Sequence, residues 1–253
     1  MTLRHLAVRL VAGLCCCCLA ASAAAHNITV AFGESLEPYV IPTSASGIEV
    51  DIIREALQHS KLGLKPVFLA QKRVPFALGN RNIDAVASML PEFGVKGAYS
   101  EPYIEYQDKA ITLAARNLEL ESIADLARYR VIGFPLASQY LGPSFRQLTA
   151  QHPAYSETGN QMDQNRLLYR GSIDVVVADV RIFNYMNQRM QSEFHEPVRA
   201  VRYHDLFSNL QYRVLFRSSE LRDSFNAGLR QLQRSGRYRQ IIDKYDSQFT
   251  SEP

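Results

Sequence analysis

Two aspartates stand at the two ends of one apolar stretch, IDVVVAD, at residues 173–179. The run of valines is typical of a buried β-strand, so each carboxylate lies where a strand meets a loop. Asp174 begins the strand, where a carboxylate usually fixes a turn. Asp179 ends it, and ligands of open α/β sheets bind at the carboxyl ends of strands. Since a charge in this position needs a partner, we expect Asp179 either to meet a ligand or to cap the helix predicted over residues 181–190.

The same strand-end rule selects the other polar candidates. Glu34 and Tyr39 follow an N-terminal strand. Ser88 and Lys96 belong to IDAVASMLPEFGVKG, in which a buried strand leads into a loop whose only cation is the lysine. Ser138 begins a predicted helix after another strand. By contrast, the aspartate at the start of IDAVASML is expected to fix a turn, as Asp174 does.

Strands and helices alternate along the chain. The strands are predicted at residues 27–32, 64–70, 83–90, 110–115, 130–134 and 173–179, and helices at 47–63, 73–78, 120–129, from 138, and at 160–169. This alternation predicts an α/β fold with parallel sheets. The segment LGNRNIDAVASML (78–90) resembles LYRGSIDVVVADV (168–180). We interpret the two as equivalent strands in two similar lobes.

The composition is that of a globular protein. The chain has 253 residues, of which 47% are hydrophobic and 21% charged, with a net charge of +3. The charges are spread along the sequence, so nothing predicts a basic surface for nucleic acid. No motif for a metal, a cofactor or a catalytic nucleophile is present, and we expect none of these. In particular, the His195–Glu196 pair lacks the second histidine that a zinc-binding helix requires.

The N-terminus has the features of a secretory signal peptide. Arg4 and Arg9 precede an apolar stretch over residues 10–20, and Ala23-Ala24-Ala25 fits the small-residue rule for cleavage before His26. All four cysteines, residues 15–18, lie in the apolar stretch, where they act as small hydrophobic residues. The mature chain is therefore expected to be exported, nearly neutral and free of disulfides.

Six blocks in order resemble the family 3 extracellular solute-binding proteins, most of which serve amino-acid ABC transporters. They are LEPYVIPTSASGIEVDIIREAL, NIDAVASML, AYSEPYIE, SIADLARYRVIGFPLAS, SIDVVVAD and ELRDSFNAGLRQLQRSGRYRQIIDKY. The resemblance implies a type II periplasmic binding protein fold, with two α/β lobes joined by two crossing strands. Lobe 1 would comprise residues 26–112 and 207–253, and lobe 2 residues 113–206, with the hinge near 109–113 and 208–211. A ligand would be enclosed by hinge closure.

The resemblance also implies roles for the candidates. Asp179 matches the acid that pairs with a ligand ammonium, and Tyr39 the aromatic residue that packs on the ligand, although it could equally be core. Glu34 lies one residue from a family acid. Ser138 matches a hydroxyl at a helix start that holds an anion. The family arginine that grips a ligand carboxylate is not evident, and Glu92, Phe93 and Lys96 stand where it is expected. Lys96 is either a point charge for the ligand or a solvated loop lysine.

The resulting expectation is a monomeric periplasmic protein that captures a small polar, amino-acid-like ligand, with an inner-membrane ABC permease as partner. Two alternatives stay open at this point. Some proteins of this fold are enzymes, for example cyclohexadienyl dehydratases, which need a positioned acid. Others bind a ligand as stand-alone sensory or accessory proteins. The ligand itself is not predicted by the sequence.

Overall fold

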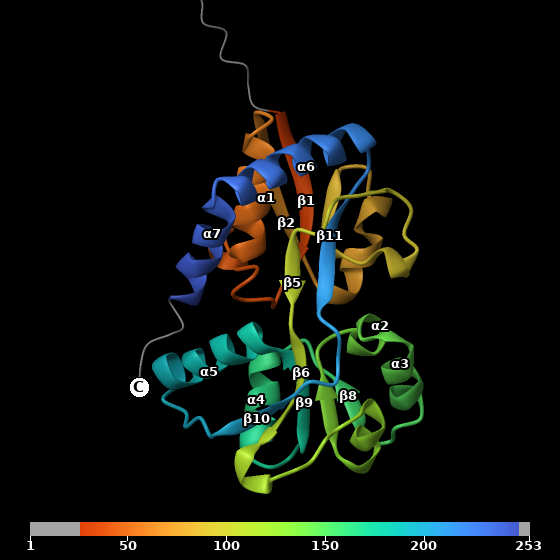
Figure 1. The fold of residues 1–253 in the computed structure, drawn as a ribbon, viewed down its shortest axis with the longest axis vertical. Helices are drawn as coiled ribbons and strands as arrows, with labels where there is room; N and C mark the ends of the chain where they lie inside the picture. The colour runs from red at the N-terminus through yellow and green to blue at the C-terminus, as the bar shows by residue number, and fades with distance from the viewer. Residues whose placement is uncertain (1–25, 248–253) are drawn as a thin grey trace, which may run out of the picture.

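The computed structural model describes residues 26–247 and arranges them in two α/β bodies, one above the other in Figure 1. Each body is built on its own β-sheet, with helices packed against it. The predicted signal peptide, residues 1–25, lies outside the described residues. Among residues 26–247, no helix has the length and apolar character needed to cross a membrane.

The first sheet has the strand order β2-β1-β3-β11-β4, with β5 paired to β11. Strand β1 runs parallel to β2 and β3, whereas β11 is antiparallel to its neighbours. The strands are β1 (His26–Gly33), β2 (Leu62–Leu69), β3 (Ala85–Met89), β4 (Ala98–Tyr99), β5 (Ile104–Tyr106) and β11 (Leu210–Phe216). The helices of this body are α1 (Ile48–Gln58), α6 (Ser219–Arg234) and α7 (Arg237–Asp246).

The second sheet has the order β10-β6-β9-β7-β8. Strands β7, β8 and β9 are parallel, and β6 is antiparallel to β9 and β10. The strands are β6 (Asp108–Leu113), β7 (Val131–Gly133), β8 (Tyr155–Glu157), β9 (Val175–Asp179) and β10 (Val201–His204). Its helices are α2 (Ala137–Tyr140), α3 (Gly142–Ala150), α4 (Gln161–Tyr169) and α5 (Val180–Phe194).

Short 3₁₀ helices fill several connections. They are η1 (Pro42–Ser44), η2 (Gln71–Gly79), η3 (Pro91–Phe93), η4 (Ala114–Arg116) and η5 (Ile123–Arg128). The segments predicted as helices at 73–78 and 120–129 are therefore 3₁₀ turns. The α/β fold with two sheets is as predicted. The sheets are mixed and not wholly parallel, because β11 in the first sheet and β6 in the second run antiparallel to their neighbours.

Two connections join the bodies. Strand β5 continues into β6 with only Gln107 between them, and the chain returns between β10 and β11 (Figure 1). The predicted lobe boundaries at residues 112 and 207 stay predictions. The first change of sheet falls at Gln107, ahead of the predicted hinge at 109–113, because β6 already pairs with β9 from Asp108 onward.

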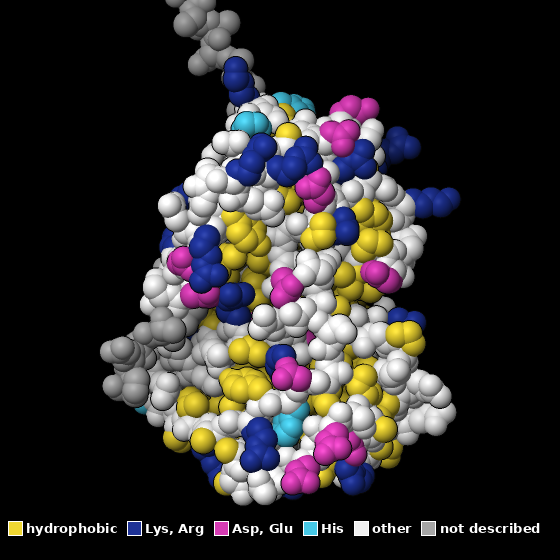
Figure 2. Space-filling view, in the orientation of Figure 1, with side chains coloured by type: hydrophobic (Ala, Val, Ile, Leu, Met, Phe, Trp, Pro, Cys, Tyr) yellow, Lys and Arg dark blue, Asp and Glu magenta, His cyan; other side chains and the backbone are white. Residues whose placement is uncertain are grey.

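One hydrophobic cluster runs through both bodies, from Phe32 and Ile53 in the first to Val176 and Phe183 in the second. Two smaller clusters cover the outer faces of the two sheets. Figure 2 shows that lysine and arginine side chains on one face are separated by acidic and uncharged residues. The apolar interior thus reaches the contact between the bodies, where the polar side chains of the cavity lie.

The two aspartates that begin the echoed strands are structural, as predicted. Asp84 precedes β3 and accepts a hydrogen bond from Thr29 N at 2.8 Å. Asp174 precedes β9 and accepts from the guanidinium and backbone N–H of Arg130 and from Arg116. Hydrogen bonds from Arg130 hold the pKa of Asp174 well below its usual range. Both carboxylates thus form hydrogen bonds that link the start of their strand to a neighbouring segment.

Candidate ligand-binding site

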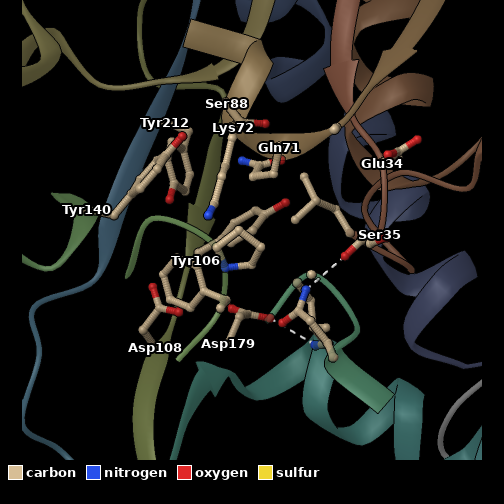
Figure 3. Close-up of a pocket in the computed structure, with 17 residues that line it drawn as sticks. Glu34, Ser35, Gln71, Lys72, Ser88, Tyr106, Asp108, Tyr140, Asp179 and Tyr212 are labelled. Atoms are coloured by element: carbon tan, nitrogen blue, oxygen red, sulfur yellow. Dashed lines mark hydrogen bonds between the residues drawn. The ribbon is translucent and has the colours of Figure 1, made fainter. Parts of the chain in front are cut away.

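A cavity of about 220 Å³ lies between the two bodies and is lined from both of them. The volume suits a small molecule rather than a polymer. The first body contributes the loop after β1, the start of η2 and the end of β3, and the second contributes the start of β6, the loop after β7 and the end of β9. Figure 3 shows the side chains that converge on it. The polar and aromatic residues are Glu34, Ser35, Gln71, Lys72, Ser88, Tyr106, Asp108, Phe134, Tyr140, Gln161, Asp179 and Tyr212.

Asp179 lines this cavity and also caps α5. Its Oδ1 accepts from Ile182 N at 3.0 Å, and its Oδ2 accepts from Gln107 N at 2.8 Å and from the Tyr39 hydroxyl at 3.2 Å. Burial raises the pKa of Asp179, and the two backbone N–H donors act against this rise. Asp179 therefore caps α5 and lines the cavity at the same time, so the two roles predicted for it are compatible.

A second aspartate lies beside it that sequence reasoning missed. Asp108 on β6 is the register partner of Asp179 on β9. Its side chain is buried, and among the described residues its Oδ2 has no hydrogen-bond partner. Burial, and then the negative charge of Asp179, raise the pKa of Asp108 well above its usual range. The only signal in the sequence is an acid at the start of the apolar strand DKAITL.

Ser88 lines the cavity from the end of β3 and is held from behind by Glu49 of α1. Its hydroxyl donates to Glu49 Oε2 at 2.8 Å. The hydroxyls of Tyr103 and Tyr106 donate to the same carboxylate at 2.5 and 2.6 Å. Burial raises the pKa of Glu49, and the three hydroxyl donors counteract it. Glu49 therefore fixes two residues of the cavity wall, Ser88 and Tyr106.

Tyr39 lies behind the wall instead of lining this cavity. Its ring stacks on Tyr106 with centroids 3.9 Å apart, and its hydroxyl accepts from Arg181 Nη1 at 2.8 Å while donating to Asp179. Arg181 also pairs with Asp246 at 2.7 Å, and so ties α5 to the end of α7. In this structure Tyr39 positions Asp179 and contributes to the contact between the bodies.

The helix start predicted to hold an anion is already occupied by a carboxylate of the protein. Glu157 at the end of β8 accepts from Leu136 N at 2.7 Å and Ser138 N at 3.0 Å, and from the Tyr155 hydroxyl at 2.9 Å. Burial acts to raise the pKa of Glu157, but these donors outweigh it and hold the pKa below its usual range. Ser138 itself does not line the cavity. The backbone donors that a ligand anion would use are thus taken.

The two remaining candidates differ in place. Glu34 lines the mouth of the cavity with an exposed side chain. Lys96 is exposed in the loop after β3 and is not among the lining residues, so the structure supports its reading as a solvated loop lysine. The cation in the lining is instead Lys72, which η2 directs into the cavity (Figure 3). No arginine is among the described residues that line the cavity.

Residues 28–248 match the model of the bacterial extracellular solute-binding proteins, family 3. The chain belongs to this family. The match covers the blocks from which the resemblance was predicted. The comparison with curated proteins finds no match.

Several solved structures share the fold of this chain. A mutant of ArgBP from T. maritima superposes with a TM-score of 0.67 at 18% identity, covering 87% of this chain and 95% of that chain. A histidine kinase sensor domain with similarity to periplasmic binding proteins superposes with a TM-score of 0.71 at 16% identity, covering 87% of this chain and 96% of that chain. AncCDT-1 is an ancestral amino acid-binding protein and a precursor of cyclohexadienyl dehydratase. It superposes with a TM-score of 0.65 at 17% identity, covering 87% of this chain and 94% of that chain. At these identities the likeness establishes the type II binding-protein fold.

Proposed function

We propose that this family 3 solute-binding protein works in the periplasm, where it captures a small, polar, amino-acid-like ligand between its lobes for ABC-type import. The observation that carries the proposal is the cavity between the two sheets, with the buried Asp179 at its wall. A buried carboxylate in a small enclosed site is suited to a ligand that brings a positive group. The protein acts as a monomer, with an inner-membrane permease as partner.

Closure around the ligand is tested by two measurements on the purified protein. A thermal-shift screen of amino acids, polyamines, dicarboxylates and aromatic acids identifies a ligand. At ~100 times Kd it should stabilise the fold by ~2.7 kcal/mol, or roughly 5–10 °C in Tm. Small-angle scattering compares the radius of gyration with and without that ligand, and the liganded form should be the more compact. A broad panel that changes neither quantity would contradict the proposal.

A second candidate, an enzyme on the same fold, is favoured by one observation. Asp108 is a buried carboxyl group that lines the cavity, and burial together with the charge of Asp179 raises its pKa, which is the direction that a general acid requires. A dehydratase of the cyclohexadienyl type would use such a group to protonate a leaving hydroxyl. Incubation with prephenate and arogenate separates the two candidates. Catalytic turnover that Asp108→Asn abolishes supports the enzyme, and stoichiometric binding without product supports the binding protein.

A further inference from the structure

We infer that the cavity takes an organic ammonium ion without a carboxylate, an alkylamine or a diamine, in place of a zwitterionic amino acid. The inference deepens the proposed function and rests on it. Three observations carry it: a buried carboxylate oxygen that lacks a donor, a wall of tyrosine rings, and the lack, in the described lining, of both an arginine and a free helix start to hold a ligand carboxylate.

The buried carboxylate is that of Asp108. The neighbouring Asp179 is supplied with donors from Ile182, Gln107 and Tyr39, whereas Asp108 Oδ2 has none among the described residues. A buried acceptor left without a donor costs on the order of 1–3 kcal/mol, so native proteins rarely keep one without a use. An ammonium group has three N–H donors and a positive charge, and meets both needs of Asp108 at once.

A second acceptor is available on the same cavity. Gln161 at the start of α4 is buried, and its Nε2 donates to Ser35 O at 2.8 Å, which fixes the orientation of the amide. Its Oε1 has no partner among the described residues. Like Asp108, Gln161 lines the cavity from the second body. The Tyr140 hydroxyl, which also lines the cavity from this body and has no partner among the described residues, can accept as well as donate. The unpartnered atoms of this body in the lining can thus all accept a hydrogen bond, which suits a ligand whose polar part consists of donors.

Tyrosine rings form the wall beside these acceptors (Figure 3). The centroid of the Tyr212 ring lies 4.9 Å from the ring centroid of Tyr106 and 5.8 Å from that of Tyr140. The faces of such rings attract organic cations, and more strongly where water is excluded. The same rings pack well on methylene groups, so an alkyl chain that bears the ammonium also finds contacts here.

Two groups that would hold a carboxylate, an arginine and a free helix start, are missing from the described lining of the cavity, and Lys72 is the cation that lines it. The backbone N–H groups of Leu136 and Ser138 are bound to Glu157, and no arginine is among the described lining residues. The lining cation, Lys72, points into the cavity with Asp108 and Asp179 (Figure 3). A cationic ligand would therefore compete with Lys72 for the two acids, whereas a zwitterion would use Lys72 as the partner of its carboxylate. This opposition makes Lys72 the residue that decides between the two ligand classes.

The first experiment compares amino acids with the amines that differ from them only by loss of the carboxylate. Isothermal titration calorimetry would measure ornithine against putrescine, lysine against cadaverine, and tyrosine against tyramine. We expect the preferred amine to bind at least about tenfold more tightly than its amino acid, which is about 1.4 kcal/mol. Amino acids that bind as tightly as their amines would overturn the inference but leave the solute-binding function intact. If no compound of the wider screen binds, the proposed function fails as well.

The second experiment uses charge variants with matched controls, titrated with the best-binding amine. Asp108→Asn should weaken binding by about 10- to 100-fold, because it removes the charge that faces the ammonium. Its control is Glu92→Gln, which neutralises an exposed acid outside the cavity and should leave Kd unchanged. Lys72→Met should strengthen amine binding several-fold, and the control Lys96→Met should not. A Lys72→Met protein that remains folded and loses tenfold or more in affinity would show that Lys72 holds a ligand anion, and the inference would be wrong.

Discussion

Glu49 and Asp108 are both buried acids without a paired arginine or lysine among the ion pairs of the described chain, yet their surroundings differ. Glu49 receives three hydroxyl hydrogen bonds, from Ser88, Tyr103 and Tyr106. Asp108 has another acid as its cross-strand neighbour and an oxygen with no donor. The first arrangement is complete within the protein, so Glu49 serves the fold. The second is incomplete, which is what a binding site requires of a group that must still meet a ligand.

The comparison also separates indirect from direct roles at the cavity. Glu49 does not line it, but it fixes the hydroxyls of Ser88 and Tyr106, which do. Removing Glu49 should therefore lower the stability of the whole fold. Removing the charge of Asp108 should raise the stability of the unliganded fold and weaken ligand binding. Stability measurements on the unliganded protein can test this difference in sign.

The largest effect is expected for Glu49→Ala. The change leaves three buried hydroxyls without their acceptor and opens a cavity, so it should destabilise the fold by ~3–5 kcal/mol, lowering Tm by roughly 10 °C. Thermal unfolding followed by circular dichroism measures it. Glu49→Gln keeps the volume and one oxygen acceptor, and should lose less than half as much. Equal stability of wild type and Glu49→Ala would break the distinction between the two acids.

A smaller effect of opposite sign is expected for Asp108→Asn. An amide in this place removes the repulsion from Asp179 and the cost of burying a charge, so the unliganded variant should gain about 1 kcal/mol near pH 8, or ~2–4 °C in Tm. Chemical denaturation of both proteins without ligand measures the difference. A variant less stable than wild type at this pH would show that the Asp108 carboxylate has a stabilising partner.

The same variant should change the dependence of stability on pH. The pKa of Asp108 is raised in the folded state, so the folded protein keeps a proton that the unfolded chain loses above about pH 4, and stability falls as pH rises from there. The groups that face Asp108 are Asp179 from β9, Tyr212 from β11 and Lys72 from η2. Because the pKa values of Glu49 and Asp179 are also raised, Asp108→Asn should reduce this slope and not abolish it. Denaturant titrations from pH 5 to pH 8 give both slopes, and identical slopes would contradict the expectation.

The smallest effect is expected for Asp174→Asn. Asp174 is a buried acid that, unlike Glu49 and Asp108, is paired with two arginines. The half-exposed Arg116 and Arg130 are screened by solvent, so the loss at pH 7 should be only ~1 kcal/mol. The pKa of Asp174 is lowered in the folded state, so its contribution is fully present above about pH 4 and is lost progressively as pH falls through the lowered pKa of the folded protein. Wild type and variant should therefore differ less at pH 3 than at pH 7, which denaturation at the two pH values tests. A difference that is as large at pH 3 as at pH 7 would contradict the expectation.

The sequence predicts the elements whose patterns are local. The alternation of strand and helix patterns predicts the α/β fold, and the valine run that ends at Asp179 predicts the edge of the sheet at which the cavity lies. Strand β10 was missed, since VRYH is short and mostly exposed and has no apolar alternation. Strand β5 was missed because it is only three residues long.

The site was harder to predict because its chemistry depends on residues that are distant in sequence. Nothing near Ser138 indicates that Glu157 will occupy the helix start, since that contact requires β8 to lie beside β7. The importance of Asp108 likewise depends on its pairing with Asp179, which is a property of the sheet register. Lys96 is the cation of the loop in which the family arginine is expected, but the cavity receives its cation from Lys72, on a different connection.

The ion pair between Arg181 and Asp246 has a kinetic consequence. It joins α5 to α7 across the two bodies, so a hinge motion that separates these helices to release a ligand must first break the ion pair. Both side chains are partly exposed, at 28% and 35%, and a pair of this kind is worth only ~0–1 kcal/mol. Its strength falls as ions screen the charges, within a Debye length of ~8 Å at physiological ionic strength. The residence time of a bound ligand should therefore shorten a few-fold in concentrated salt, even when the ligand's own contacts do not depend on the salt concentration.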